Sequence, residues 1–416
     1  MHFQSPLELV NYARENSPFY KNLYFELVEN FNWADIPLVE QEHFWLANGL
    51  EDNQLLTGKS EGAIFFKSGG TTGNPKFSIF TNSEWKSFCQ AFGEGMGEAN
   101  LSFGDRVANL FYGGELYASF LFIHESIQNC GVNVTQFPIA GNSSPEDVAK
   151  YCNDFQINVL CGVPTTFLLL AHYCIKEKIT LPLSKLLYGG EALFEDQLDV
   201  LKSAFPNIEI HSVGYASVDG GLLGKRALDC KGSEHRVFKN LVVMEILNDS
   251  GEIVENNKEE GKLYLTNLTR RLMPIIRYPV GDKARWIEVG EKFEILGRTD
   301  EGARIGPVTI TREDIIEVFK NLDILKDIVQ FQMVLEHSEG KDFLRICIVS
   351  DCSDLKKENN IESEFYKVRK MYKDSIEKGV VSELCISFVK DEHIERNART
   401  GKLIHVLDKR KREFSS

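Results

Sequence analysis

Residues 67–76 read Lys-Ser-Gly-Gly-Thr-Thr-Gly-Asn-Pro-Lys, and the rest of the chain is organised around this stretch. The apolar run 63–66 before it predicts a buried strand. Glycine lets backbone N–H groups approach a ligand closely, and successive inward N–H groups form an anion-binding concavity. Hydroxyl side chains and Lys76 add donors and positive charge, so the stretch predicts a polyphosphate-binding loop. A polar hairpin loop is the alternative, and the spacing differs from that of the P-loop NTPases.

The string 68–76 resembles the phosphate loop of the adenylate-forming superfamily, which contains acyl- and aryl-CoA synthetases, peptide-synthetase adenylation domains and luciferases. These enzymes make an acyl-adenylate from a carboxylic acid and ATP and usually pass the acyl group to a thiol. The segment 16–21 is similar to a motif near the start of phenylacetate-CoA ligases. The resemblance implies that Lys76 takes part in catalysis and that six residues bind ATP: Ser68, Gly69, Gly70, Thr71, Thr72 and Gly73.

The composition of the 416-residue chain, with 43% hydrophobic and 26% charged residues, predicts a soluble globular protein of two or three domains. The formal net charge of −14 argues against nucleic acid or an anionic membrane as the main partner. We find no apolar run near the roughly 18 residues of a membrane span, and no evident signal peptide. The nine cysteines form no Cys-x-x-Cys pair, which predicts reduced thiols in a cytoplasmic protein.

Apolar runs alternate with helical patterns between residues 106 and 188, which predicts a parallel sheet flanked by helices. We therefore expect an α/β fold with a large N-terminal lobe of mainly parallel sheets over residues 1–299. As in the superfamily, residues 300–416 would form a small, mobile α+β lid domain, with a hinge near Asp300. Ligands bind beyond the carboxyl ends of parallel strands, and such positions suggest an acyl pocket formed by Tyr112, Gly113, Gly114, Phe137 and Pro138.

Two segments resemble the adenine-binding elements of the superfamily. The first is Gly189-Gly190-Glu191, for which an ordinary strand-to-helix turn is the alternative. The second is the segment 215–219, which resembles a Tyr-Gly-x-Thr-Glu motif. The resemblance implies that Tyr215 stacks on adenine and that both segments line the nucleotide site.

The same motif implies contacts to the phosphates and to a metal ion. Ser217 would contact the α-phosphate of ATP, and Asp219 would help to hold Mg²⁺. The chain departs from the motif twice, with Ala216 in place of glycine and Asp219 in place of glutamate. Aspartate is a good ligand for hard cations, but it is one methylene shorter, so the metal could be held through a water or less tightly.

Two further motifs complete the resemblance around the nucleotide. Asp282 ends an Arg-Tyr-x-x-Gly-Asp element, and the resemblance implies that it accepts hydrogen bonds from both ribose hydroxyls, as two carboxylate oxygens allow. Arg298 would contact ribose or phosphate, and Asp300 would be the hinge between the lobes. Lys402 follows Thr-Gly and matches the lysine that bridges the substrate carboxylate and the α-phosphate. A solvated surface lysine is the alternative at this position.

The sequence thus predicts an AMP-forming acid–thiol ligase that resembles phenylacetate-CoA ligase. It would convert an aryl or small acyl acid to an acyl-adenylate with release of pyrophosphate, and then transfer the acyl group to CoA. ATP, Mg²⁺ and CoA are the expected cofactors, and a homodimer is left open. The alternatives are an enzyme that passes the acyl group to an amine or a carrier-protein thiol, a catalytically silent nucleotide-binding homologue, and a structural protein that uses only the scaffold. The presence of Asp282, Arg298 and Lys402 argues against a silent homologue.

The segment after the hinge departs from the superfamily pattern. Arg304 can stand for a lysine of that pattern, but an arginine that precedes the next glycine is missing. Pro307 has a fixed φ, whereas hinge motion needs residues that absorb a change in φ and ψ. We derive the hypothesis that adenylation is competent while transfer to free CoA is slow, altered or directed to another acceptor.

Replacing Lys402 by alanine should leave ATP binding nearly intact and slow adenylation by roughly 10²–10³-fold, the usual effect of losing one preorganised charge contact. Acid-dependent pyrophosphate exchange measures this rate. Exchange within a few-fold of the wild-type rate would remove Lys402 from the mechanism.

Overall fold

The computed structural model describes residues 2–68, 76–190, 193, 195–248, 250–298, 303–305, 308–338, 341–350, 358–377, 381–396, 401 and 403–409. The chain divides into two compact units, residues 1–193 with 201–298 and residues 194–200 with 299–416. Each unit has its own hydrophobic core. Within the described ranges, no helix is both long and apolar enough to cross a lipid bilayer.

The first unit begins with short helices and an antiparallel hairpin. Its first elements are α1 (Pro6–Asn16), α2 (Pro18–Leu23), the 3₁₀ helix η1 (Trp33–Asp35), α3 (Gln41–Leu46), β1 (Ala63–Ser68) and β2 (Lys76–Thr81). Ser17 ends α1, and its side chain accepts the N–H of Tyr20 to cap α2. In the hairpin Ser68 pairs with Lys76, so the glycine-rich stretch connects two paired strands.

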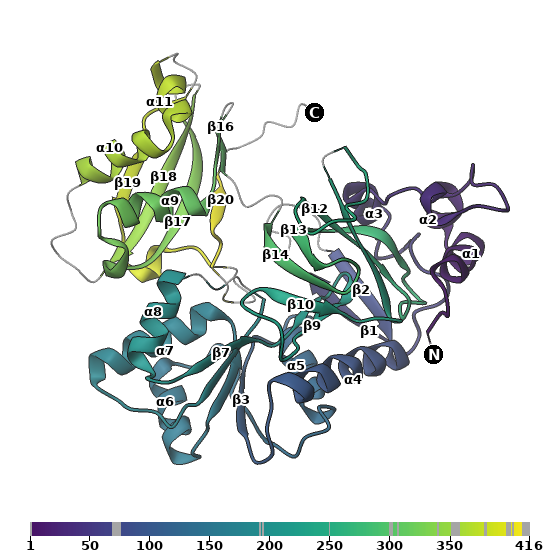
Figure 1. The fold of residues 1–416 in the computed structure, drawn as a ribbon, viewed down its shortest axis with the longest axis horizontal. Helices are drawn as coiled ribbons and strands as arrows, with labels where there is room; N and C mark the ends of the chain where they lie inside the picture. Colours follow the sequence, from purple (N-terminus) through teal and green to yellow (C-terminus); the bar gives the residue numbers. More distant parts are fainter. Residues whose placement is uncertain are drawn as a thin grey trace. The chain divides into compact units, whose positions relative to one another are not determined.

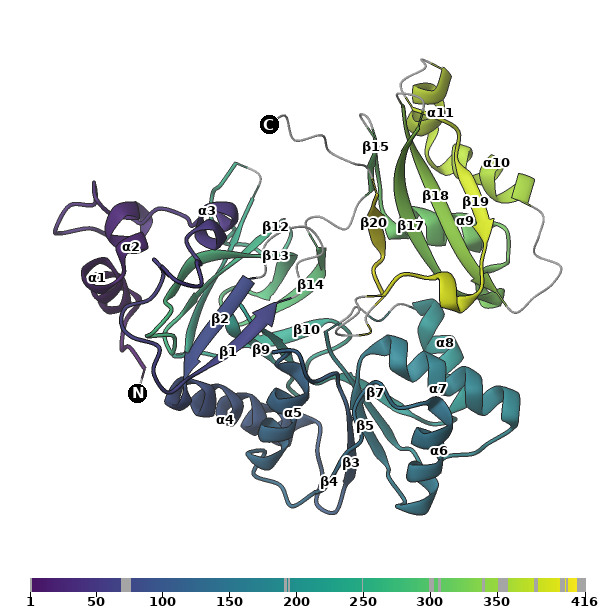
Figure 2. The same ribbon diagram turned by 180° about the vertical axis from the view of Figure 1, so that it is seen from behind.

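A five-stranded parallel sheet follows, in the order β4-β3-β5-β6-β7. Its strands are β3 (Arg106–Leu110), β4 (Thr135–Pro138), β5 (Val159–Gly162), β6 (Lys185–Tyr188) and β7 (Glu209–Ser212). The helices of this part are α4 (Asn82–Ala99), α5 (Ser119–Gln128), α6 (Pro145–Asp154) and α7 (Pro164–Glu177). The next helix, α8 (Glu195–Ala204), contains residues that belong to both units. Figures 1 and 2 show α5 on one side of the sheet and α6 with α7 on the other. The predicted α/β fold is confirmed.

A seven-stranded antiparallel sheet completes the first unit, in the order β11-β12-β13-β14-β10-β9-β8. Its strands are β8 (Tyr215–Ser217), β9 (Gly221–Lys225), β10 (Glu234–Val237), β11 (Val242–Leu247), β12 (Glu260–Asn267), β13 (Ile275–Glu288) and β14 (Lys292–Arg298). The expectation of mainly parallel sheets therefore holds for the five-stranded sheet only. Tight turns join several of these strands, and such turns connect antiparallel neighbours, whereas parallel pairs need long crossovers.

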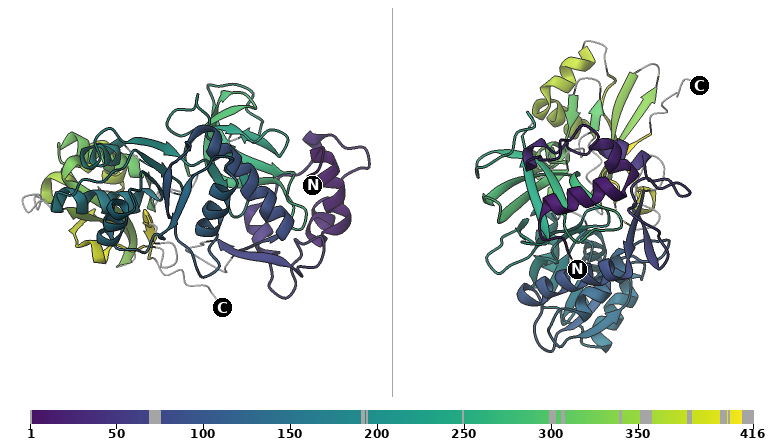
Figure 3. Two further views of the ribbon diagram at one scale, coloured as in Figure 1. Left: turned by 90° about the horizontal axis from the view of Figure 1, so that it is seen from below. Right: turned by 90° about the vertical axis from the view of Figure 1, so that its right-hand side faces the viewer.

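The N-terminal segment is attached to β13 by buried polar contacts, and Figure 3 shows its helices beside the strands of the antiparallel sheet. The Arg277 guanidinium donates to both carboxylate oxygens of Glu245 at 3.0 and 3.1 Å and to the carbonyl of Ile36. The hydroxyl of Tyr20 donates to the carbonyl of Pro274 at 3.0 Å. Arg277 and Glu245 are both buried, so their ion pair is part of the core.

The second unit contains a four-stranded sheet in the order β19-β18-β17-β20 and a small β15-β16 hairpin. Its elements are β15 (Ala303–Ile305), β16 (Val308–Ile310), α9 (Arg312–Asn321), η2 (Leu325–Asp327), β17 (Ile328–Ser338), β18 (Lys341–Ser350), α10 (Glu358–Val368), α11 (Lys370–Glu377), β19 (Cys385–Phe388), η4 (Asp391–His393) and β20 (Val406–Asp408). Apolar side chains of α9, α10 and α11 pack with those of β17 and β18 in one core. After β17 and β18 the chain thus forms two helices, α10 and α11, before β19, and the role of this unit as a mobile lid stays a prediction.

Replacing Arg277 by methionine should destabilise the first unit by about 3–5 kcal/mol, because Glu245 would remain as a buried, unpaired charge. Chemical denaturation measures this free energy of unfolding. Arg285→Met on the same strand is the matched control, since its pair with Glu294 is half-exposed and should contribute less than about 1 kcal/mol. Equal effects of the two substitutions would contradict the structural role of Arg277.

Candidate active site

The candidate site is built on a row of strand ends. Leu110, Gly162, Tyr188 and Ser212 are the last residues of β3, β5, β6 and β7, and they pair with one another in register. In the sheet, β4 lies on one side of β3, whereas β5, β6 and β7 lie on its other side. The direction in which strands are added therefore reverses between β3 and β5. Ligands of open parallel sheets bind in the crevice at such a reversal, and the loops that follow these four strands leave at the same edge.

The loop after β3 contains three of the five residues proposed for the acyl pocket. The carbonyl of Tyr112 accepts the N–H of Phe120 at 3.1 Å. A Cβ on Gly113 would lie 2.9 Å from that of Phe120, so glycine allows this close approach. Gly114 has a φ of 91°. A Cβ on Gly141, which follows β4, would lie 2.8 Å from the ring of Tyr112, so the loop after β3 packs closely against the loop after β4.

Phe137 and Pro138 lie on the other side of β3, at the end of the edge strand β4. The ring of Phe137 packs against Phe155, with centroids 5.5 Å apart, and beneath the guanidinium of Arg106 at 4.9 Å. Pro138 is exposed. β4 pairs with β3 on the side opposite to β5, so Phe137 and Pro138 do not lie at the strand-order reversal, and the acyl pocket stays a prediction.

The two segments predicted to bind adenine lie side by side. The N–H of Gly189 donates to the carbonyl of Gly162 at 3.1 Å, and a Cβ on Gly189 would lie 2.8 Å from a methyl carbon of Val213. Gly214 has a φ of 126°, and a Cβ there would lie 2.8 Å from the ring of Phe92. Both glycines are thus required by close packing, and they bring the loop after β6 against the turn that leads to Tyr215.

A buried serine–histidine pair holds this turn. The Oγ of Ser212 lies 2.9 Å from Nε2 of His235 and accepts the N–H of Gly214 at 3.1 Å. Nδ1 of His235 lies 3.0 Å from the carbonyl of Ser233. Because a carbonyl only accepts, this network assigns the proton to Nδ1 and makes Nε2 the acceptor from Ser212. Burial lowers the pKa of His235 to about 4, so the ring is neutral at pH 7. Its centroid is 5.8 Å from that of Tyr215.

Three residues predicted to bind the nucleotide converge. The hydroxyl of Tyr215 donates a hydrogen bond to the carboxylate of Asp282. Asp282 pairs in register with Arg298 across β13 and β14. The structure therefore unites residues from three separate motifs, at positions 215, 282 and 298.

The turn after Ala216 carries the predicted metal ligand. The Oγ of Ser217 accepts the N–H of Gly220 at 2.8 Å, which closes the turn that contains Asp219. Asp219 is half-buried. In the described part of the chain, no group of three or more histidine, cysteine, aspartate or glutamate side chains could hold a metal ion.

Lys76 lies at the start of β2, with its ammonium group 5.3 Å from the centre of the Trp45 ring. The indole N–H of Trp45 donates to the hydroxyl of Tyr278 at 2.9 Å. Lys76 is thus held near β13, the strand that bears Asp282.

Several predicted site residues lie outside the described part of the chain: Gly69, Gly70, Thr71, Thr72, Gly73, Glu191, Asp300 and Lys402. For Ser68 and Arg298 the structure describes the backbone only. Gly190 follows β6 with a φ of 76°.

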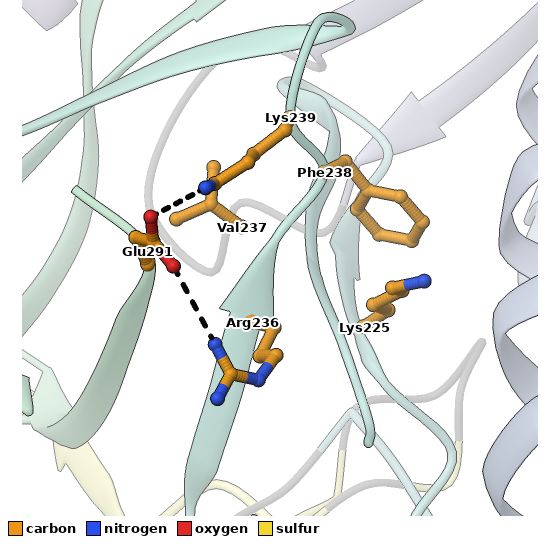
Figure 4. Close-up of a pocket in the computed structure, with 6 residues that line it drawn as sticks. All are labelled: Lys225, Arg236, Val237, Phe238, Lys239 and Glu291. Atoms are coloured by element: carbon orange, nitrogen blue, oxygen red, sulfur yellow. Dashed lines mark hydrogen bonds and ion pairs between the residues drawn. The ribbon is translucent and has the colours of Figure 1, made fainter. Parts of the chain in front are cut away.

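A cavity of about 350 Å³ lies elsewhere on the antiparallel sheet, and Figure 4 shows the residues that line it: Lys225, Arg236, Val237, Phe238, Lys239 and Glu291. Carboxylates pair with each of its cations. Lys239 contacts Glu291 at 2.5 Å, Arg236 contacts Glu288 at 3.1 Å, and Lys225 contacts Glu98 at 2.7 Å. Because its charges are already balanced, this cavity is a poor site for a polyphosphate, and it contains none of the predicted site residues.

The geometry thus combines a parallel sheet with a strand-order reversal, an antiparallel sheet, and a tyrosine, an aspartate and an arginine position that lie together. No family model matches the chain. It is 31% identical to the indoleacetate–lysine synthetase of Pseudomonas savastanoi over 195 residues, 46% of this chain and 45% of that enzyme. It is 23% identical to a phenylacetate-coenzyme A ligase of Thermus thermophilus over 352 residues, 80% of this chain and 76% of that enzyme.

The fold is similar to that of 2-hydroxyisobutyryl-CoA ligase in the postadenylation state, with a TM-score of 0.75 at 14% identity over 97% of this chain and 88% of that structure. The chain is thus similar in sequence to phenylacetate-coenzyme A ligases over most of its length, and similar in fold to an acyl-CoA ligase, as its motifs predicted for the adenylate-forming superfamily. The resemblance seen in its motifs is confirmed. The match to the lysine synthetase, by contrast, spans less than half of that enzyme.

Replacing Asp282 by alanine should weaken ATP binding by about 1.5–3 kcal/mol, because the ribose hydroxyls would lose a charged hydrogen-bond acceptor. Calorimetry measures this affinity directly. Glu288→Ala, on the same strand and half-exposed, is the matched control and should bind ATP like the wild type. Unchanged ATP affinity in the Asp282 variant would show that this carboxylate does not contact the nucleotide.

Proposed function

We propose that this protein activates a carboxylic acid with ATP to give an acyl-adenylate and pyrophosphate, and then transfers the acyl group to CoA. The observation that carries the proposal is the convergence of Tyr215, Asp282 and the backbone position of Arg298 beside the row of parallel strand ends. The named relatives include a phenylacetate-coenzyme A ligase, which supports an aryl or small acyl acid as the substrate.

In the first step a carboxylate oxygen of the acid attacks the α-phosphorus of ATP. A new carboxyl O–P bond forms, the bond from the α-phosphorus to its bridging oxygen breaks, and pyrophosphate leaves. Positioning and charge stabilisation supply most of the catalysis in such displacements. Asp282 would hold the ribose, Tyr215 would stack on adenine, and Lys402 would stabilise the charge between the carboxylate and the α-phosphate.

In the second step the sulfur of CoA attacks the acyl carbon of the adenylate. A C–S bond forms, the acyl C–O bond breaks with its electron pair going to AMP, and the thiol proton passes to water. The same site serves both steps, because AMP stays on the nucleotide-binding residues until the thioester has formed.

Mg²⁺ is part of the proposal, and the residues present fit it. This ion is usually held by one or two carboxylates together with substrate phosphates and waters. Asp219, in a half-buried turn closed by Ser217, supplies one such carboxylate. When bound, Mg²⁺ neutralises charge on the β- and γ-phosphates. A cytoplasmic location is the part of the proposal that rests on the cysteine content of the sequence, and a homodimer stays open.

An amine acceptor is the second candidate, and two observations favour it. The match to the indoleacetate–lysine synthetase has an identity of 31%, against 23% for the phenylacetate-coenzyme A ligase of Thermus thermophilus. The segment after Asp300 also departs from the superfamily pattern, as its sequence shows at Pro307. An amine nitrogen would then replace the sulfur of CoA as the attacking atom, and the product would be an amide.

Pyrophosphate exchange across a panel of aryl and short-chain acids tests adenylation. With an active acid in hand, single-turnover mixing separates adenylate formation from acyl transfer to CoA, to lysine and to a buffer control. We expect exchange with at least one acid and faster transfer to CoA than to lysine. Faster transfer to lysine would select the second candidate, and saturable ATP binding without exchange for any acid would contradict both.

A further inference from the structure

Arg270 is a fully buried cation next to the candidate site, on the connection between β12 and β13. Its residue is 1% exposed, and its guanidinium lies 3.7 Å from the centre of the Phe80 ring. Burial lowers the pKa of Arg270 to about 10, so the side chain is still charged at pH 7. Removing a charge from water is costly unless hydrogen bonds and opposite charge compensate it. The partners of Arg270 must therefore supply this compensation.

The hydrogen bonds of Arg270 lead to the strand that leaves the glycine-rich stretch. Its two terminal nitrogens lie 3.3 and 3.4 Å from Oγ of Ser78, and one of them donates to the carbonyl of Ile79 at 3.0 Å. Ser78 in turn donates its hydroxyl proton to the carbonyl of Val218 at 2.7 Å. Ser78 is itself fully buried. A continuous chain of contacts thus runs from Arg270 through Ser78 on β2 to the residue before Asp219.

Two carboxylates compensate the charge of Arg270 at longer range, those of Glu84 and Asp219. The Glu84 carboxylate accepts three backbone hydrogen bonds, from the N–H groups of Thr81, Arg271 and Leu272. Asp219 stands in the turn closed by Ser217. The buried cation therefore acts on the same turn in two ways, by attraction of the Asp219 carboxylate and by the hydrogen bonds through Ser78.

We propose that Arg270 is a positioning residue of the adenylation site, which fixes β2 and the Asp219 turn in one arrangement suited to Mg²⁺–ATP. The inference rests on the proposed function, because Asp219 is assigned to the metal there. Arg270 touches neither nucleotide nor metal in this account; it acts through Ser78, Val218 and Asp219. The sequence reading missed it because a charged residue between two strands is ordinarily a surface residue.

The test measures ATP binding by calorimetry over a series of Mg²⁺ concentrations, together with the thermal unfolding midpoint. Arg270→Met keeps much of the side-chain volume and removes the charge, and Ser78→Ala breaks the link while keeping the charge. Both variants should need about tenfold more Mg²⁺ for half-maximal ATP binding, the scale of one lost hydrogen bond to a charged group. Arg270→Lys should recover part of the shift, since lysine keeps the charge but lacks the planar fork.

Arg271→Met is the matched control, because Arg271 is the next residue, exposed, and stacked on Phe3 and Tyr12. It should show the Mg²⁺ dependence of the wild type. A folded Arg270→Met protein with wild-type Mg²⁺ dependence would overturn the proposal, and so would an equal shift in the Arg271 variant. If the Arg270→Met protein does not fold, the Ser78→Ala protein provides the test. An Mg²⁺ dependence of ATP binding equal to that of the wild type in this variant would also overturn the proposal.

The binding readout separates this inference from the proposed function. A wild-type protein that binds Mg²⁺–ATP but shows no pyrophosphate exchange with any acid would contradict the proposed function. The shift in Mg²⁺ dependence between the wild type and the Arg270 and Ser78 variants would still decide the role of Arg270. A wild-type protein that binds no ATP would contradict both.

Discussion

The register of four parallel strands is the constraint on which the candidate site depends. Because Leu110, Gly162, Tyr188 and Ser212 are paired across β3, β5, β6 and β7, the loops that follow them leave the sheet at one edge. A shift of one residue in any strand would turn its side chains to the opposite face. It would also separate Gly189 from Val213, whose contact leaves no room for a Cβ. The buried strands thus fix the spacing of loops that have little regular structure of their own.

The Arg-Tyr-x-x-Gly-Asp element, residues 277–282, contains residues that stabilise the fold and a residue of the candidate nucleotide site. Arg277 has a φ of 44°, and the pairing of β12 with β13 is irregular there. This irregularity lets Arg277 reach Glu245 while Tyr278 receives the indole N–H of Trp45. Both residues therefore hold the N-terminal segment, whereas Asp282 accepts a hydrogen bond from Tyr215. The arginine and tyrosine of this element therefore stabilise the fold, and its aspartate belongs to the candidate nucleotide site.

The sequence predicted those parts of the fold and site that depend on local pattern. Alternating apolar runs and helix starts such as Ser144-Pro145 predicted the parallel sheet, and the motifs predicted Tyr215 and Asp282, which the structure brings into contact. Strand order could not be predicted in this way, and it places β4, which ends with Phe137 and Pro138, on the side of β3 opposite to β5. Residues that act through long-range contacts were also missed. His235 and Arg270 are buried by segments distant in sequence, so nothing beside them in the chain distinguishes them from surface residues.

A crystal structure of the protein with AMP bound would show where the nucleotide lies without requiring the acid to be known. We expect the ribose hydroxyls on the carboxylate of Asp282 and the adenine ring against Tyr215, beside Gly189. AMP in the cavity lined by Arg236 and Lys239, or at any position away from the ends of β6 and β7, would contradict this expectation.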